Sequence, residues 1–140
     1  MYKSALLRVC VWIVALALVS GCAGIGKGPS DEELIRTLLE KWKTAAEALD
    51  IEAQMALCSE SLESTWGDRK ATKEFLLDAK DKGYLEDMKV FIDEAETTVD
   101  GDVATVYPLE VASAMGGATL ELTLAKEAGG WIITGMESEY

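Results

Sequence analysis

The sequence of 140 residues contains no histidine, which is the commonest general base and the commonest metal-binding side chain in proteins. This absence excludes Ser-His-Asp and Cys-His catalysis, together with zinc sites built from cysteine and histidine. We therefore expect neither a metal ion nor a cofactor.

Cysteine is also scarce, with only Cys10, Cys22 and Cys58 in the chain. Cys10 lies in an apolar N-terminal run, so a single cysteine remains if that run is removed and Cys22 is modified. A lone cysteine in an exported protein is either a reactive thiol or a small buried hydrophobe. Cys58 follows Met55, Ala56 and Leu57, which favours burial.

Basic residues are few, since 13 lysines and arginines stand against 25 aspartates and glutamates, for a net charge of −12. Loss of residues 1–21, which hold Lys3 and Arg8 and no acid, changes the net charge to −14. Such a surface repels nucleic acid and anionic lipid headgroups, so neither is an expected partner.

The apolar run at residues 9–19 is short, with 11 residues where a membrane-spanning helix needs about 20. It follows the positive charges of Lys3 and Arg8 and precedes the small residues Ser20 and Gly21. This arrangement is typical of a cleaved signal peptide.

The segment Val19-Ser20-Gly21-Cys22 resembles the lipobox of bacterial lipoprotein signal peptides, with valine in place of the usual leucine. The resemblance implies a diacylglyceryl thioether on Cys22, cleavage between Gly21 and Cys22, and acylation of the new amine, for which palmitate is the typical chain. Two or three acyl chains anchor a protein stably, whereas one chain binds only marginally.

We therefore expect a signal peptide at 1–21, a flexible tether at 22–29 and a domain at 30–140. Lipid on Cys22 would hold the domain at the cell envelope. Ala23 is not an inner-membrane retention signal of the aspartate type. In a cell with two membranes, the expected location is thus the outer membrane, facing the periplasm.

Helical spacing dominates the first part of the predicted domain. Ser30 and Glu33 form a capping-box pattern, and apolar residues then recur at helical spacing over 31–49. A second helix is predicted over 51–58, capped by Asp50, and a third over 69–82, ended by Gly83. Residues 59–65 are polar and are expected to form a loop.

Alternation replaces helical spacing after Gly83. Strands are predicted at 88–97, 103–115, 119–126 and 131–136, joined by turns at Asp100-Gly101, Gly116-Gly117 and Gly129-Gly130. Pro108 falls inside the second strand, where we expect an edge, a bulge or a bend. Helices followed by hairpin-linked strands predict an α+β domain, with three helices packed on a curved, four-stranded antiparallel sheet.

Three local patterns extend this prediction: Leu-Glu-Lys-Trp at 39–42 in the first helix, the helix junction at 48–57, and the strand pair 120–127 with 130–136. Together they resemble the nuclear transport factor 2-like superfamily, the cystatin-like α+β cone, over residues 30–137. The resemblance implies a conical pocket between sheet and helices. Some relatives are isomerases, cyclases, dehydratases or epoxide hydrolases, and many others bind ligands or dimerise.

Large apolar side chains are the candidates for lining such a pocket, although core packing also uses them. The candidates are Trp42, Met55, Trp66, Phe75, Tyr107 and Trp131.

Acidic residues are the only candidates for acid–base chemistry. Asp93, Glu94 and Glu96 lie on one predicted strand, where a solvated face explains them as well as a cation site does. Asp50 and Glu110 are candidates for a buried carboxylate of raised pKa, but Asp50 also suits a helix cap.

These observations favour a lipid-anchored, non-enzymatic binding or assembly module. Its partner would be an apolar small ligand in the cone, or a protein, such as a second copy, on the open sheet face. One alternative is an isomerase or cyclase that uses a buried carboxylate. The other is a purely structural envelope lipoprotein.

Overall fold

The computed structural model describes residues 28–139, so the predicted signal peptide and lipobox lie outside the described residues. Residues 31–139 belong to one compact unit. Among the described residues, no helix is both long and apolar enough to cross a membrane.

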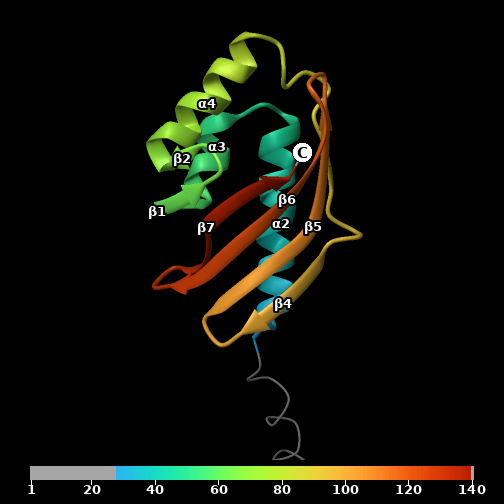
Figure 1. Cartoon of the computed structure of the whole chain (residues 1–140). Helices are drawn as coiled ribbons and strands as arrows, with labels where there is room; N and C mark the ends of the chain where they lie inside the picture. Colours follow the sequence, from blue (N-terminus) through green and yellow to red (C-terminus); the bar gives the residue numbers. More distant parts are fainter. Residues whose placement is uncertain (1–27, 140) are drawn as a thin grey trace, which may run out of the picture. The chain divides into compact units, whose positions relative to one another are not determined.

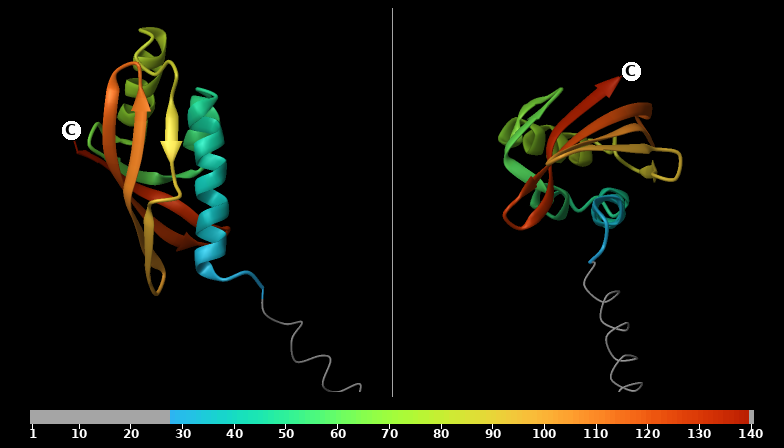
Figure 2. Two further views of the ribbon diagram at one scale, coloured as in Figure 1. Left: turned by 90° about the vertical axis from the view of Figure 1, so that its right-hand side faces the viewer. Right: turned by 90° about the horizontal axis from the view of Figure 1, so that it is seen from below.

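Three helices lie on one side of a curved sheet (Figures 1 and 2). They are α2 (Asp31–Glu47), α3 (Ile51–Ala56) and α4 (Arg69–Asp81). The α+β prediction and the three helices are confirmed. Asp50 caps α3 as predicted, its Oδ1 accepting a hydrogen bond from the Ala53 N–H at 3.0 Å, and Gly83 follows α4 with a φ of 78°.

The sheet has seven strands, so the prediction of four was wrong. The strands are β1 (Cys58–Ser64), β2 (Gly67–Asp68), β3 (Lys89–Phe91), β4 (Glu96–Asp100), β5 (Val103–Ser113), β6 (Gly116–Glu127) and β7 (Gly130–Glu139). Their order is β2-β1-β7-β6-β5-β3, and β4 also pairs with β5.

Residues 58–64, which were predicted to form a helix end and most of a loop, form strand β1 instead. It pairs with β7 in parallel, so the sheet is mixed rather than purely antiparallel. Only Cys58, Ser59 and Leu62 of β1 are buried, and its partner lies about 70 residues further along the chain. Local alternation is therefore too weak to reveal this strand.

The strand predicted at 88–97 is divided into β3 and β4, which pair with successive parts of β5. β4 pairs with residues 103–107 of β5, and β3 pairs with residues 110–112. Pro108 lies between these parts, where the β5–β6 register also shifts. We expected an edge, a bulge or a bend at Pro108, and the ladder is interrupted there, as suits a residue that has no N–H to donate.

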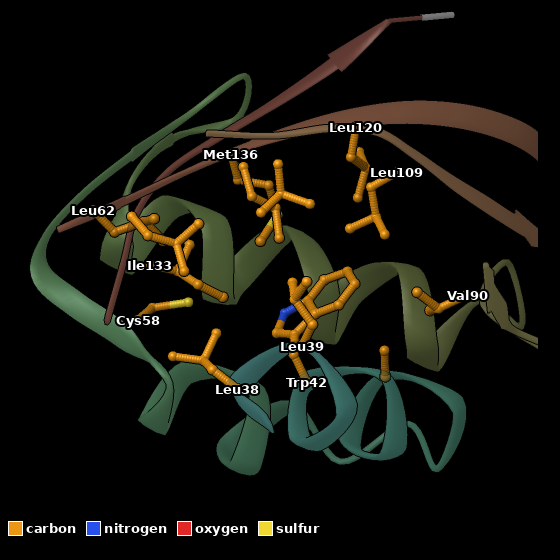
Figure 3. Close-up of a cluster of buried hydrophobic side chains, with 14 of the residues drawn as sticks. Leu38, Leu39, Trp42, Cys58, Leu62, Val90, Leu109, Leu120, Ile133 and Met136 are labelled. Atoms are coloured by element: carbon orange, nitrogen blue, oxygen red, sulfur yellow. The ribbon is translucent and has the colours of Figure 1, made fainter. Parts of the chain in front are cut away.

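The core lies between the helices and the inner face of the sheet. The predicted alternation in β6 is confirmed, since Leu120, Leu122 and Leu124 are all buried. They meet Ile35 and Leu39 of α2 in one continuous apolar cluster. Figure 3 shows these two layers facing each other across the interior.

An ion pair fastens the short strand β3 to α2. Lys43 Nζ donates to the Val90 carbonyl at 2.7 Å, and Glu47 Oε1 accepts from the Val90 N–H at 3.0 Å. Lys43 also hydrogen-bonds to Glu47. The bonds from Lys43 and from the Val90 N–H hold the pKa of Glu47 below its usual value.

Glu47→Gln is expected to lower the free energy of unfolding by about 1 kcal/mol at pH 7. Because the pKa of Glu47 is lowered on folding, its carboxylate stabilises the fold above the unfolded-state pKa of about 4.3. That contribution is lost as the pH falls through the folded-state pKa. Urea denaturation between about pH 7 and pH 3 should therefore show a steeper loss of stability in the wild type than in Glu47→Gln. Parallel profiles would contradict this role.

Candidate functional site

A cavity of about 150 Å³ lies between the helices and the inner face of the sheet. Its walls come from α2, α3 and α4 on one side and from β5, β6 and β7 on the other. In Figure 3, Trp42 points from α2 toward the strands that carry Leu120 and Met136. All three residues line the cavity.

Apolar side chains make up most of the cavity wall, and no aspartate, glutamate, lysine or arginine contributes to it. The aromatic and methionine side chains are Trp42, Trp66, Phe75, Met88, Met115 and Met136. The aliphatic and small residues are Ala46, Leu76, Leu85, Val111, Gly116, Gly117, Ala118 and Leu120, and the polar ones are Gln54, Ser113 and Ser138.

Trp66 and Phe75 form a stacked pair in one wall. Their ring centroids are 4.6 Å apart and their planes differ by 10°. Trp66 follows β1 and Phe75 lies on α4, so the stack joins the edge of the sheet to the helix above it. Both side chains are half-buried, which leaves part of this aromatic surface free for contact.

The β5–β6 turn closes the other side of the cavity. The Ala114 N–H donates to the Glu86 carbonyl at 2.9 Å, and the Met115 N–H donates to the Tyr84 carbonyl at 3.1 Å. These bonds tie the turn to the segment after α4. Met115 is exposed, so the cavity wall reaches the protein surface at this turn.

Two cavity residues that carry polar groups, Gln54 and Trp42, are buried, and so is the hydroxyl oxygen of the half-buried Ser138. Gln54 and Trp42 are only 5% and 4% exposed, respectively. Within the described part of the chain, the Trp42 indole N–H and the Ser138 hydroxyl are buried without a hydrogen-bond partner. Unpaired buried polar groups cost about 1–3 kcal/mol each, so they stand out in an otherwise apolar wall.

Three of the six predicted lining residues border the cavity and three do not. Trp42, Trp66 and Phe75 line the cavity, whereas Met55, Tyr107 and Trp131 do not. Met55 is 1% exposed and belongs to the core cluster. Tyr107 is exposed, and its hydroxyl donates to Glu139 at 3.4 Å.

Trp131 lies at the start of β7 and fastens that strand to the first turn of α2. Its Nε1–H donates to Asp31 Oδ1 at 3.0 Å, and Lys126 Nζ lies 2.7 Å from the same oxygen. The bonds from Lys126 and Trp131 lower the pKa of Asp31. Trp131 therefore connects elements of the fold and does not border the cavity.

The acidic candidates also lie outside the cavity. Asp50 and Glu110 border two broad surface hollows of about 420 and 460 Å³. These hollows are larger than the cavity, but exposed side chains form most of their walls. Asp50 caps α3, and Glu110 accepts a hydrogen bond from Thr119 at 2.9 Å.

Asp93, Glu94 and Glu96 do not lie on one strand, contrary to the prediction, because only Glu96 belongs to a strand, β4. Asp93 and Glu94 lie between β3 and β4, and Asp93 pairs with Arg36 at 2.6 Å. In residues 28–139 there is no cluster of three or more acidic or cysteine side chains suited to hold a metal ion.

Cys58 is buried, as its apolar surroundings predict. Its exposed fraction is 4%, and its Sγ lies 3.5 Å from the Gln54 carbonyl oxygen. Burial raises the pKa of the thiol to about 11. Cys58 is therefore protonated at neutral pH and packs as a small apolar side chain.

Gln54 is the cavity residue that sequence patterning had missed. It lies three residues after Ile51, so the two share one side of α3, and the adjacent Met55 is buried as well. A polar residue on an apolar helical stripe is the signal that could have found it. Ser113 and Ser138 carry no such signal.

Solved structures resemble this domain in fold at low sequence identity. A nuclear transport factor 2-like protein with a cystatin-like fold from Novosphingobium aromaticivorans has a TM-score of 0.60 and 20% identity, over 91% of this chain and 86% of that one. One of unknown function from Shewanella oneidensis has a TM-score of 0.61 and 21% identity, over 78% and 98%.

A third such protein of unknown function, from Pseudomonas putida, has a TM-score of 0.64 and 14% identity, over 75% and 82%. No protein-family model matches the sequence, and no curated protein matches it. The domain thus has the nuclear transport factor 2-like, or cystatin-like, fold.

Proposed function

We propose that this chain is a lipid-anchored cell-envelope protein whose domain binds an apolar small molecule without transforming it. The observation that carries the binding role is the cavity, whose wall is apolar and contains no charged side chain. Apolar pockets with a few polar groups are typical ligand sites. The lipobox-like segment ending at Cys22 supports the anchoring role.

The lipid on Cys22 would place the domain at the outer membrane, facing the periplasm, in a cell with two membranes. An isomerase or cyclase of the kind considered above would need a carboxylate in the cone. Asp50 and Glu110 lie outside the cavity, so that mechanism has no residue here to carry it.

The outer face of the sheet supports a second candidate function, assembly with another copy or with an envelope protein. Phe91, Val103 and Tyr107 are exposed large side chains on β3 and β5. Dimerisation without ligand uptake would favour this structural role over the binding role. Analytical ultracentrifugation together with the ligand titration below separates the two.

Toluene is the probe for the binding role, and thermal unfolding of the anchored chain in lipid nanodiscs is the measurement. A ligand that binds only the folded state at about 100 times its Kd stabilises it by about 2.7 kcal/mol. For a domain of this size, in which each 1 kcal/mol shifts Tm by about 4–5 °C, that raises Tm by about 10–15 °C. An unchanged Tm in the wild type would contradict the proposal.

Ala118→Phe and Ala112→Phe are matched variants for this titration. Ala118 lines the cavity, and Ala112 lies on the neighbouring strand but does not line it. Phenylalanine at 118 fills the cavity and should remove the toluene-dependent rise in Tm, whereas phenylalanine at 112 should leave it intact. Equal responses of the two variants would place the toluene site elsewhere.

A further inference from the structure

We propose that the cavity recognises a neutral, ring-bearing ligand through one carbonyl-type oxygen, which accepts hydrogen bonds from the Gln54 carboxamide and the Trp42 indole. This inference rests on the proposed binding function and adds the chemical class of the ligand.

The neutrality of the ligand follows from the composition of the wall. No lysine or arginine lines the cavity to pair with an anion, and no acidic side chain lines it to pair with a cation. Burying an unpaired charge costs far more than burying an unpaired neutral polar group. A carboxylate or an ammonium group would therefore be rejected.

The acceptor oxygen follows from the unpaired groups in the wall. An indole N–H can only donate, and that of Trp42 is buried without a partner. Gln54 is 5% exposed and also lines the cavity, and its carboxamide forms no hydrogen bond to another described residue. Its NH₂ group can donate as well. A single acceptor oxygen on the ligand can therefore serve as the hydrogen-bond partner of both side chains.

The ring follows from the size and shape of the cavity. A cavity of about 150 Å³ in another protein holds benzene, and the volume here is about 150 Å³. The stacked pair of Trp66 and Phe75 supplies a planar aromatic surface. Met88, Met115 and Met136 supply flexible, polarisable contacts that adjust to the outline of a ring.

Acetophenone and α-methylstyrene test the inference, because they share one shape and differ in a C=O against a C=CH₂ group. Their affinities are measured by equilibrium dialysis against the anchored full-length chain in nanodiscs, with empty nanodiscs as the blank. The wild type is compared with Gln54→Met, which keeps the side-chain length, and with Trp42→Phe, which removes the indole N–H. Glu52→Met, on the exposed side of α3, is the control variant.

Gln54→Met and Trp42→Phe should each weaken acetophenone relative to α-methylstyrene by about five- to tenfold. Glu52→Met should leave the ratio of the two affinities unchanged. Because each variant is judged by this ratio, a general change in cavity volume cancels. Benzoate should bind more weakly than acetophenone to the wild type.

An unchanged affinity ratio in both cavity variants would overturn carbonyl recognition, and tighter binding of benzoate would overturn neutrality. Either result leaves the apolar binding function intact if α-methylstyrene still binds. If neither probe binds the wild type, the proposed function itself fails.

Discussion

Replacing Cys22 with alanine is expected to abolish acylation and signal cleavage, so that the chain accumulates as an unprocessed precursor. The thiol of Cys22 is the atom that would carry the lipid, and alanine offers no nucleophile in its place. Because two or three acyl chains provide the stable anchoring, the loss of membrane anchoring in this variant should be complete rather than partial. Metabolic labelling with a palmitate analogue and the mobility of the chain on a gel measure both steps.

Cys58→Ala is the matched control for this experiment. It removes the other cysteine of the predicted mature chain but leaves the segment at 19–22 unchanged. Acylation and processing should then match the wild type, although loss of a buried side chain will lower stability somewhat. Normal processing of Cys22→Ala would refute the lipobox assignment.

Leu122→Ala is expected to lower the free energy of unfolding by about 3–4 kcal/mol. Leu122 is 0% exposed and lies on the inner face of β6, in the middle of the cluster between sheet and helices. Its truncation removes apolar contact area and leaves a void that the packed strands cannot close. Since small domains have total stabilities of about 5–15 kcal/mol, a loss of this size is severe.

Val103→Ala is the comparison for Leu122→Ala, because Val103 is 49% exposed at the start of β5. Its truncation should cost less than about 1 kcal/mol. Urea denaturation followed by tryptophan fluorescence measures both variants, with similar m-values required for the comparison. Similar losses in the two variants would mean that burial at Leu122 does not control stability.

Local patterns were sufficient to predict the helices and the central hairpins. The apolar stripe along α2 and the alternation of buried leucines at 120, 122 and 124 in β6 are patterns of residues only a few positions apart. Asp50 and Gly83 mark helix ends through their own backbone and side-chain preferences. These features need no knowledge of distant partners.

The candidate site was predictable only in part. Trp42 and Phe75 lie on helical stripes, so their inward direction could be predicted, and Trp66 precedes the helix that carries Phe75. Tyr107 was assigned to the pocket, yet it lies on the exposed side of β5, because size alone does not tell which face of a strand a residue occupies. Gln54 was missed because only large apolar and aromatic side chains were considered as lining residues.

By itself, the sequence determined the α+β class, the positions of the three helices and the core face of β6. It also determined the lipobox-like segment at 19–22, whose role stays a prediction. Only the tertiary structure decided that β1 pairs with β7, and that Gln54, Trp42 and Ser138 come from different elements to one cavity. The physical reason is the distance along the chain between the residues that interact. Periodicity and capping act over a few residues, whereas strand pairing and cavity walls depend on packing between segments far apart in the chain.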